Sequence, residues 1–275
     1  MGEASEDFLA PKRGFPLSSS PPFRGRGLQR ARGAKDKHML NKPTDHIVKA
    51  FDEDLKRLNN VIAEMGGLAE AQLSQAVDCL VRRNSELATQ VVQDDKRIDA
   101  LETEVGQMTV RMLALRQPMA QDLREVVAAI KIASDIERIG DYAKNIAKRA
   151  IVLSAIAPMK PAASIPRMSQ LALSIIKDVL DAYIEKDAEG ARAAWRRDED
   201  VDEMYNSLFR EMLTYMMEDP RNIGPCTHLL FIAKNIERIG DHATNIAEIV
   251  YFLVHGRSLD EERPKGDTTN VSIDG

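Results

Sequence analysis

The chain carries the same twelve-residue segment twice. IERIGDYAKNIA occupies residues 136–147, and IERIGDHATNIA occupies residues 236–247, so the copies lie 100 positions apart and share ten of twelve residues. Core packing alone tolerates many combinations of apolar side chains. The match at the polar positions therefore points to a chemical role for them.

The similarity between the two halves extends beyond this segment. Asn84 corresponds to Asp187 at an offset of 103, and Pro118 corresponds to Pro220 at an offset of 102. Each half contains three stretches with helical periodicity. The expected helices cover residues 45–83, 85–115, 119–154, 167–186, 188–217 and 223–254. Two copies are too few for an open solenoid. We expect an all-α fold of two tandem, pseudo-symmetric three-helix bundles that pack side by side.

Proline and glycine mark the expected domain boundaries. The stretch APMKPAASIP at residues 157–166 indicates a linker between a first repeat, 44–156, and a second repeat, 163–256. Residues 1–40 are rich in Pro, Gly, Ser and Arg, which predicts a disordered N-terminal extension. Residues 259–275 are expected to form a disordered C-terminal tail.

Composition and charge exclude several classes of protein. Hydrophobic residues make up 44% of the 275 positions and charged residues 29%, as in globular proteins. The net charge is −5, with +4 in residues 1–40 and −9 in the rest, so we expect no nucleic-acid binding by the body of the chain. No apolar run approaches ~18 residues, which predicts a cytoplasmic protein without membrane insertion.

Acidic and amide side chains form a stripe in each copy of the repeated segment. Residues four apart share a helical face. The stripe consists of Glu137, Asp141 and Asn145 in the first copy, and of Glu237, Asp241 and Asn245 in the second. Gly140 and Gly240 lie between the stripe and the apolar seam, the row of apolar residues that is expected to face the core. Because a glycine inside a helix costs about 1 kcal/mol relative to alanine, these positions indicate close approach of a neighbouring helix or ligand.

A second acidic pair is expected at the height of each stripe. Asp95 and Asp99 precede the turn at Pro118 by about as many residues as Glu137 and Asp141 follow it. In antiparallel helices of equal rise, such pairs lie at one level. The second repeat has the same arrangement. The predicted metal ligands are Asp95, Asp99, Glu137, Asp141, Asp198, Asp202, Glu237 and Asp241.

Two interpretations of these carboxylates remain open. Oxygen ligands suit hard cations such as Mg, Mn, Ca or ferric iron. Alternatively, the carboxylates form a solvated acidic face paired with basic neighbours. The candidate neighbours are Lys96, Arg97, Arg138 and Arg238. No glutamate has a histidine three residues later, and no P-loop, GxSxG or Cys/His nucleophile pattern occurs. We therefore expect no catalytic residues and no enzymatic activity.

Three segments carry a resemblance to a known family. LRQPMAQDLR (115–124), DIERIGDYAKNIA (135–147) and NIERIGDHATNIAE (235–248) resemble the PhoU family, and the resemblance covers about residues 44–256. It implies a cytoplasmic negative regulator of phosphate uptake and of phosphate-regulon signalling. The partners it implies are the ATPase of the phosphate ABC transporter, the phosphate-sensing histidine kinase and a second copy in a homodimer.

The resemblance also bears on metal binding. Some members of the family bind multinuclear iron or zinc clusters through E(D)xxxD motifs, and the matching positions are the eight carboxylates named above. The expected cofactor is Fe, Zn, Mg or Mn. Lys148 stands where the second copy has Glu248, which predicts weaker metal binding in the first repeat. A carboxylate-bridged metalloenzyme and a metal-storage or structural helical protein remain alternatives.

Overall fold

The structure, a computed structural model, describes residues 43–261. Within this range the regular secondary structure is entirely helical, which confirms the predicted fold class. The first half contains α1 (Pro43–Arg82), α2 (Ser85–Asp94), α3 (Lys96–Arg116) and α4 (Gln121–Ser154). The second half contains α5 (Ile165–Glu185), α6 (Ala188–Arg196), α7 (Asp198–Glu218) and α8 (Ile223–His255). Two 3-10 helices, η1 (Lys160–Ser164) and η2 (Pro220–Asn222), lie before α5 and α8. The predicted disordered extension 1–40 lies outside the described residues, as do residues 262–275 of the tail predicted at 259–275. Residues 259–261 are described, and Glu261 contacts Arg192 and Arg196 of α6.

Two of the expected helices are each divided in two. The single helix expected at 85–115 breaks at Asp95, and the one expected at 188–217 breaks at Arg197. Asp95 keeps right-handed helical dihedrals (φ −52°, ψ −35°), so the break interrupts the helix without forming a loop. Val91 and Ile98 are both buried on either side of it, which explains why the apolar periodicity runs through the break.

Equivalent capping residues begin the second helix of each repeat. The preceding helix ends at a residue in the left-handed region, Arg83 or Lys186, each with φ of 55°. The Asn84 side chain then accepts a hydrogen bond from the backbone N–H of Leu87. Asp187 accepts from two backbone N–H groups of α6. These side chains satisfy N–H groups that have no partner within the helix.

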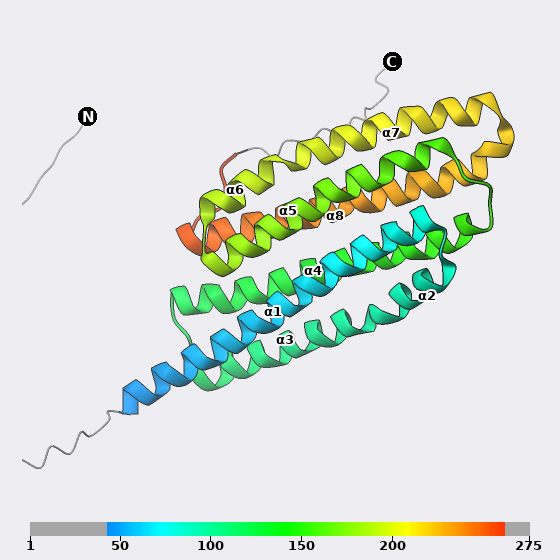
Figure 1. Ribbon diagram of the computed structural model, residues 1–275. Coiled ribbons are helices and arrows are strands. Elements are labelled where there is room, and N and C mark those ends of the chain that lie inside the picture. Colours follow the sequence, from blue (N-terminus) through cyan, green and yellow to red (C-terminus); the bar gives the residue numbers. More distant parts are fainter. Residues whose placement is uncertain (1–42, 262–275) are drawn as a thin grey trace, which may run out of the picture. The chain divides into compact units, whose positions relative to one another are not determined.

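The repeated segments form the centre of the fold. Helix α1 packs against α4, α5 packs against α8, and α4 and α8 pack against each other (Figure 1). Ile136, Ile139, Ile236 and Ile239 are all fully buried. Burying such a side chain contributes about 1.5–3 kcal/mol. The apolar half of each repeated segment therefore builds the core and fixes the orientation of its acidic half.

Helices α4 and α8 run antiparallel. Asp135 near the middle of α4 contacts Asn245 of α8, whereas Arg149 near the end of α4 stacks over Phe231, much earlier in α8. The α3–α4 turn and the α7–α8 turn consequently lie at opposite ends of the two packed repeats (Figure 1). Each turn region has an exposed methionine, Met119 (80% exposed) and Met217 (86%).

No helix within residues 43–261 has the combination of length and apolar sequence that crossing a membrane requires.

Cys79 and Cys226 are buried free thiols.

Candidate metal centres

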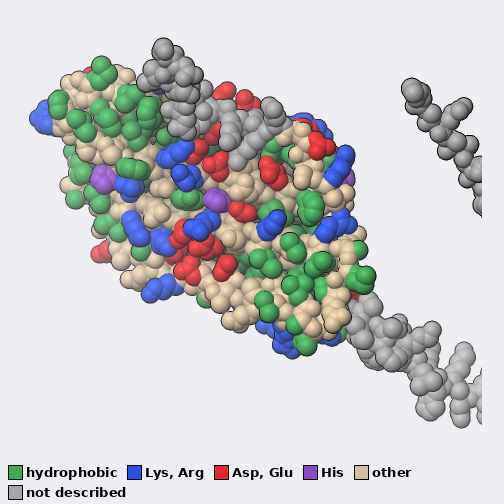
Figure 2. Space-filling view, turned by 180° about the vertical axis from the view of Figure 1, so that it is seen from behind, with side chains coloured by type: hydrophobic (Ala, Val, Ile, Leu, Met, Phe, Trp, Pro, Cys, Tyr) green, Lys and Arg blue, Asp and Glu red, His purple; other side chains and the backbone are tan. Residues whose placement is uncertain are grey.

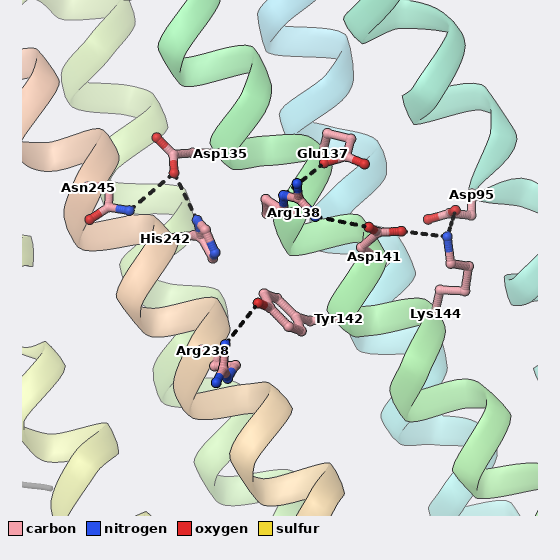
Figure 3. A network of polar contacts seen from close by, with 10 residues as sticks. All are labelled: Asp95, Asp135, Glu137, Arg138, Asp141, Tyr142, Lys144, Arg238, His242 and Asn245. Atoms are coloured by element: carbon pink, nitrogen blue, oxygen red, sulfur yellow. Dashed lines mark hydrogen bonds and ion pairs between the residues drawn. The ribbon is translucent and has the colours of Figure 1, made fainter.

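The first acidic cluster forms where the start of α3 meets the middle of α4. Asp95 is buried, and its Oδ1 accepts a hydrogen bond of 3.0 Å from Gln72 Nε2 of α1. The ammonium group of Lys144 lies 2.5 Å from Asp95 Oδ2 and 2.5 Å from Asp141 Oδ1 (Figure 3). The structure thus places Asp95 and Asp141 at one level, as their distance from the turn predicts.

The other two carboxylates of the first repeat lie close to this pair. Burial raises the pKa of Asp99, and the charge of Asp95 raises it further. Burial and the charge of Asp141 raise the pKa of Glu137 in the same way. Arg138 contacts Glu137 and Asp141 at 3.6 and 3.8 Å. Burial disfavours the charged form of Lys144, but its hydrogen bonds to Asp141 and Asp95 raise its pKa overall. On the face of the molecule drawn in Figure 2, acidic side chains are grouped among Lys and Arg side chains near the middle.

The second acidic cluster is more deeply buried than the first. Asp198, Asp202 and Glu237 are 2%, 5% and 5% exposed. Lys234 Nζ lies 2.8 Å from Glu237 Oε1, while Glu237 Oε2 is buried without a hydrogen-bond partner. Burial raises the pKa of Glu237 to about 7, against the lowering effect of Lys234, and the charge of Asp241 adds to the rise.

The helical glycines Gly140 and Gly240 make room for side chains of neighbouring helices. A Cβ at Gly140 would lie 3.0 Å from Ile98 Cδ1 and 3.5 Å from Asp95 Oδ1. A Cβ at Gly240 would collide with Asp198 Oδ1. The close approach predicted from the sequence is therefore that of Ile98 and of Gln72 Oε1, at 3.2 Å, in the first repeat and that of Asp198 in the second.

Gly240→Ala is expected to lower the free energy of unfolding by about 1 kcal/mol, because displacing Asp198 outweighs the better helix propensity of alanine. Gly67→Ala in α1 is the matched control, since a Cβ there meets nothing within 4 Å. It should raise the free energy of unfolding by about 1 kcal/mol. Urea unfolding followed by circular dichroism measures both. A stabilising Gly240→Ala would show that Asp198 adapts without cost.

The two clusters differ in how well they suit a metal ion. Within the described residues, no three Asp, Glu, His or Cys side chains are already arranged around one point as metal ligands. In the first cluster, an ammonium group stands between two carboxylates. In the second cluster, the ammonium group of Lys234 contacts only one oxygen of Glu237, and the other is buried without a hydrogen-bond partner, which suits a hard cation. The eight predicted ligands stay a prediction.

The structure adds residues that the sequence reasoning missed. Lys144, Lys234 and Gln72 supply the charge and the hydrogen bonds around the carboxylates. Position 144 carries a signal in the sequence, because it is one of only two positions at which the repeated segments differ. Its equivalent is Thr244, which leaves α8 without this ammonium group.

The other differing position lies at the contact between the repeats. The rings of Tyr142 and His242 face each other across α4 and α8, with centroids 5.6 Å apart. His242 Nδ1 lies 2.8 Å from Asp135 Oδ1, and Asn245 donates to the same oxygen at 3.2 Å (Figure 3). Asn245 therefore belongs to the contact between the repeats. That it extends the acidic stripe of α8 stays a prediction.

Comparison with known proteins accounts for the duplication. The family model described as the PhoU domain matches residues 62–150 and again 165–250. The chain belongs to the PhoU family. A PhoU homolog of Caulobacter vibrioides is 52% identical over 225 residues, which cover 82% of this chain and 98% of that protein. A PhoU homolog of Rhizobium meliloti is 52% identical over 227 residues, covering 82% and 96%. Both relatives are named phosphate-specific transport system accessory protein PhoU homologs.

Solved PhoU structures have the same fold. The crystal structure of PhoU from Pseudomonas aeruginosa superposes with a TM-score of 0.73 at 38% identity, covering 75% of this chain and all of that one. The phosphate transport system regulatory protein PhoU from Streptococcus pneumoniae gives a TM-score of 0.72 at 29% identity, covering 77% and 100%. The two PhoU-domain matches each contain one copy of the repeated segment, so each acidic stripe belongs to one PhoU domain.

Proposed function

We propose that this protein is an accessory protein of a phosphate-specific transport system and regulates phosphate uptake without catalysing a reaction. The observation that carries this proposal is the 52% identity to the Caulobacter PhoU homolog over 98% of that protein. The similarity includes both domains and is not confined to one motif.

In this proposal the protein acts in the cytoplasm as a negative regulator. It restrains uptake through the phosphate ABC transporter and restrains the phosphate-sensing histidine kinase by contacting the transporter ATPase and the kinase. A homodimer would present each contact surface twice. The resemblance of the repeated segments to the family motif supports these partners.

The acidic clusters give this regulator a site for a cation such as Fe, Zn, Mg or Mn. The second cluster is the better candidate, because Glu237 Oε2 is buried without a hydrogen-bond partner. A divalent or trivalent cation there would favour the ionised carboxylates and neutralise one face of the repeat. That change in charge would alter the affinity for a charged partner.

Deleting the gene should raise phosphate uptake and the expression of a phosphate-regulon reporter in phosphate-replete medium, because a restraint on both is removed. Radiolabelled phosphate uptake and reporter activity measure these effects, with the wild-type gene returned on a plasmid as the control. The tagged full-length protein should also retain the transporter ATPase or the kinase in a pull-down. Unchanged uptake and reporter activity after deletion would contradict the proposal.

A further inference from the structure

The two acidic clusters occupy equivalent positions but receive positive charge differently. In the first repeat, Lys144 Nζ lies 2.5 Å from both Asp95 Oδ2 and Asp141 Oδ1, and so joins the start of α3 to α4. In the second repeat the equivalent residue is Thr244. Its buried hydroxyl donates to the backbone carbonyl of Asp241 at 2.7 Å and contributes no charge.

The Lys144 ammonium group makes the contacts that a bridging metal ion would make. An ammonium group is a compact positive charge with three hydrogen-bond donors. A hard cation joins carboxylates of two helices at a similar oxygen distance, about 2.0–2.6 Å. The ammonium group and a metal ion cannot both lie between the same two oxygens. A metal ion entering this position would have to displace Lys144 from the buried Asp95.

The second cluster leaves an oxygen available. Lys234 contacts Glu237 Oε1, whereas Glu237 Oε2 is buried without a hydrogen-bond partner. Lys234 precedes Glu237 by three residues, while Lys144 follows Asp141 by three, so the two lysines approach their clusters from different ends of the acidic stripe.

We propose that the Lys144 ammonium group is the built-in cation of the first cluster, which means that it takes the place of a metal ion there. This inference rests on the proposed function. The first repeat of this chain then takes no metal ion, and any metal ion that the chain binds lies in the second repeat. The duplication has produced one PhoU domain in which a lysine joins carboxylates of two helices and one in which the equivalent residue, Thr244, is uncharged.

The experiment measures bound Mn²⁺ per full-length chain by equilibrium dialysis and elemental analysis after treatment with EDTA. Lys144→Thr places the residue of the second repeat in the first, and Lys144→Gln is a second neutral variant. Lys144→Arg is the control that retains the charge. Both neutral variants should bind one Mn²⁺ more than the wild type, and Lys144→Arg should not. The additional ion should be lost when Glu137→Gln and Asp141→Asn are added, and kept when Glu237→Gln and Asp241→Asn are added.

Two results would overturn the inference. One is that neither folded neutral variant gains Mn²⁺, because Lys144 then does not occupy a cation position. The other is that Glu137→Gln with Asp141→Asn removes Mn²⁺ from the otherwise wild-type protein, because the first cluster then binds metal beside Lys144. This second measurement needs no change at Lys144, so it decides the question even if the lysine variants do not fold.

The outcomes separate this inference from the proposed function. A wild-type protein without bound Mn²⁺ beside a Lys144→Thr variant that binds one ion would support the built-in cation and contradict a metal ion in the second repeat. The regulatory role is tested independently by phosphate uptake in the deletion strain.

Discussion

Replacing Glu237 by glutamine is expected to stabilise the metal-free protein at pH 8 by at most about 3 kcal/mol. The pKa of Glu237 is about 7 in the folded chain, against 4.5 for the ordinary group. Between these values the folded state holds a proton that the unfolded state has lost, so the stability of the wild type falls as pH rises from about 4.5 to 7. Above pH 7 the full cost of the buried charge is present, and glutamine removes it.

Urea unfolding of EDTA-treated protein at pH 4.5, 6 and 8 measures this effect. The advantage of Glu237→Gln should be small at pH 4.5 and largest at pH 8. Glu203→Gln, at an exposed position of α7, is the control and should change stability by less than about 0.5 kcal/mol. Excess Mn²⁺ should favour the wild type, because a bound cation stabilises the ionised carboxylate. A Glu237→Gln variant less stable than the wild type at pH 8 would show that the Lys234 contact outweighs burial.

Trp195→Ala should lower the free energy of unfolding by about 3–5 kcal/mol. Trp195, the single tryptophan of the chain, is 2% exposed in α6. Its indole N–H donates to Glu248 Oε1 of α8 at 3.0 Å. Truncation leaves a cavity under α6 and removes the partner of Glu248. Thermal and urea unfolding followed by far-ultraviolet circular dichroism measures the loss.

Trp195→Phe separates the two contributions. It retains an aromatic ring and removes the hydrogen bond, which contributes about 1 kcal/mol, so it should destabilise the chain much less than alanine does. Equal losses for alanine and phenylalanine would assign the effect to the contact with Glu248 instead of to packing.

Periodicity predicts the helices well, because a buried face leaves a regular apolar pattern. The seam through Ile136 and Ile139 marks α4 correctly, and the repeat marks α8. The breaks at Asp95 and Arg197 do not interrupt the apolar pattern, because the helices on both sides of each break bury the same face. The sequence therefore gives no sign of them. The sequence predicts Asp95 as a metal ligand or as part of a solvated acidic face. Only the tertiary structure shows that Gln72 and Lys144 hold it in a buried position.

The height of the acidic pairs could be predicted from the sequence, because helical rise is constant. The partners of the carboxylates could not. Lys144 of α4 contacts Asp95 at the start of the neighbouring helix α3. Asn245 of α8 contacts Asp135 of α4 because these two helices pack closely at that point. A helical wheel gives the direction of a side chain from its own axis, but it does not say which neighbouring helix lies there.

The antiparallel packing of α4 and α8 sets a separation between the regions around Met119 and Met217. Helix α4 has 34 residues and is therefore roughly 50 Å long, whereas a small domain is about 30 Å across. Two proteins that each recognised one of these turns could be bound at the same time without steric competition. A single small domain could not touch both turns. The length of the central helices therefore allows two partners to bind at the two ends simultaneously.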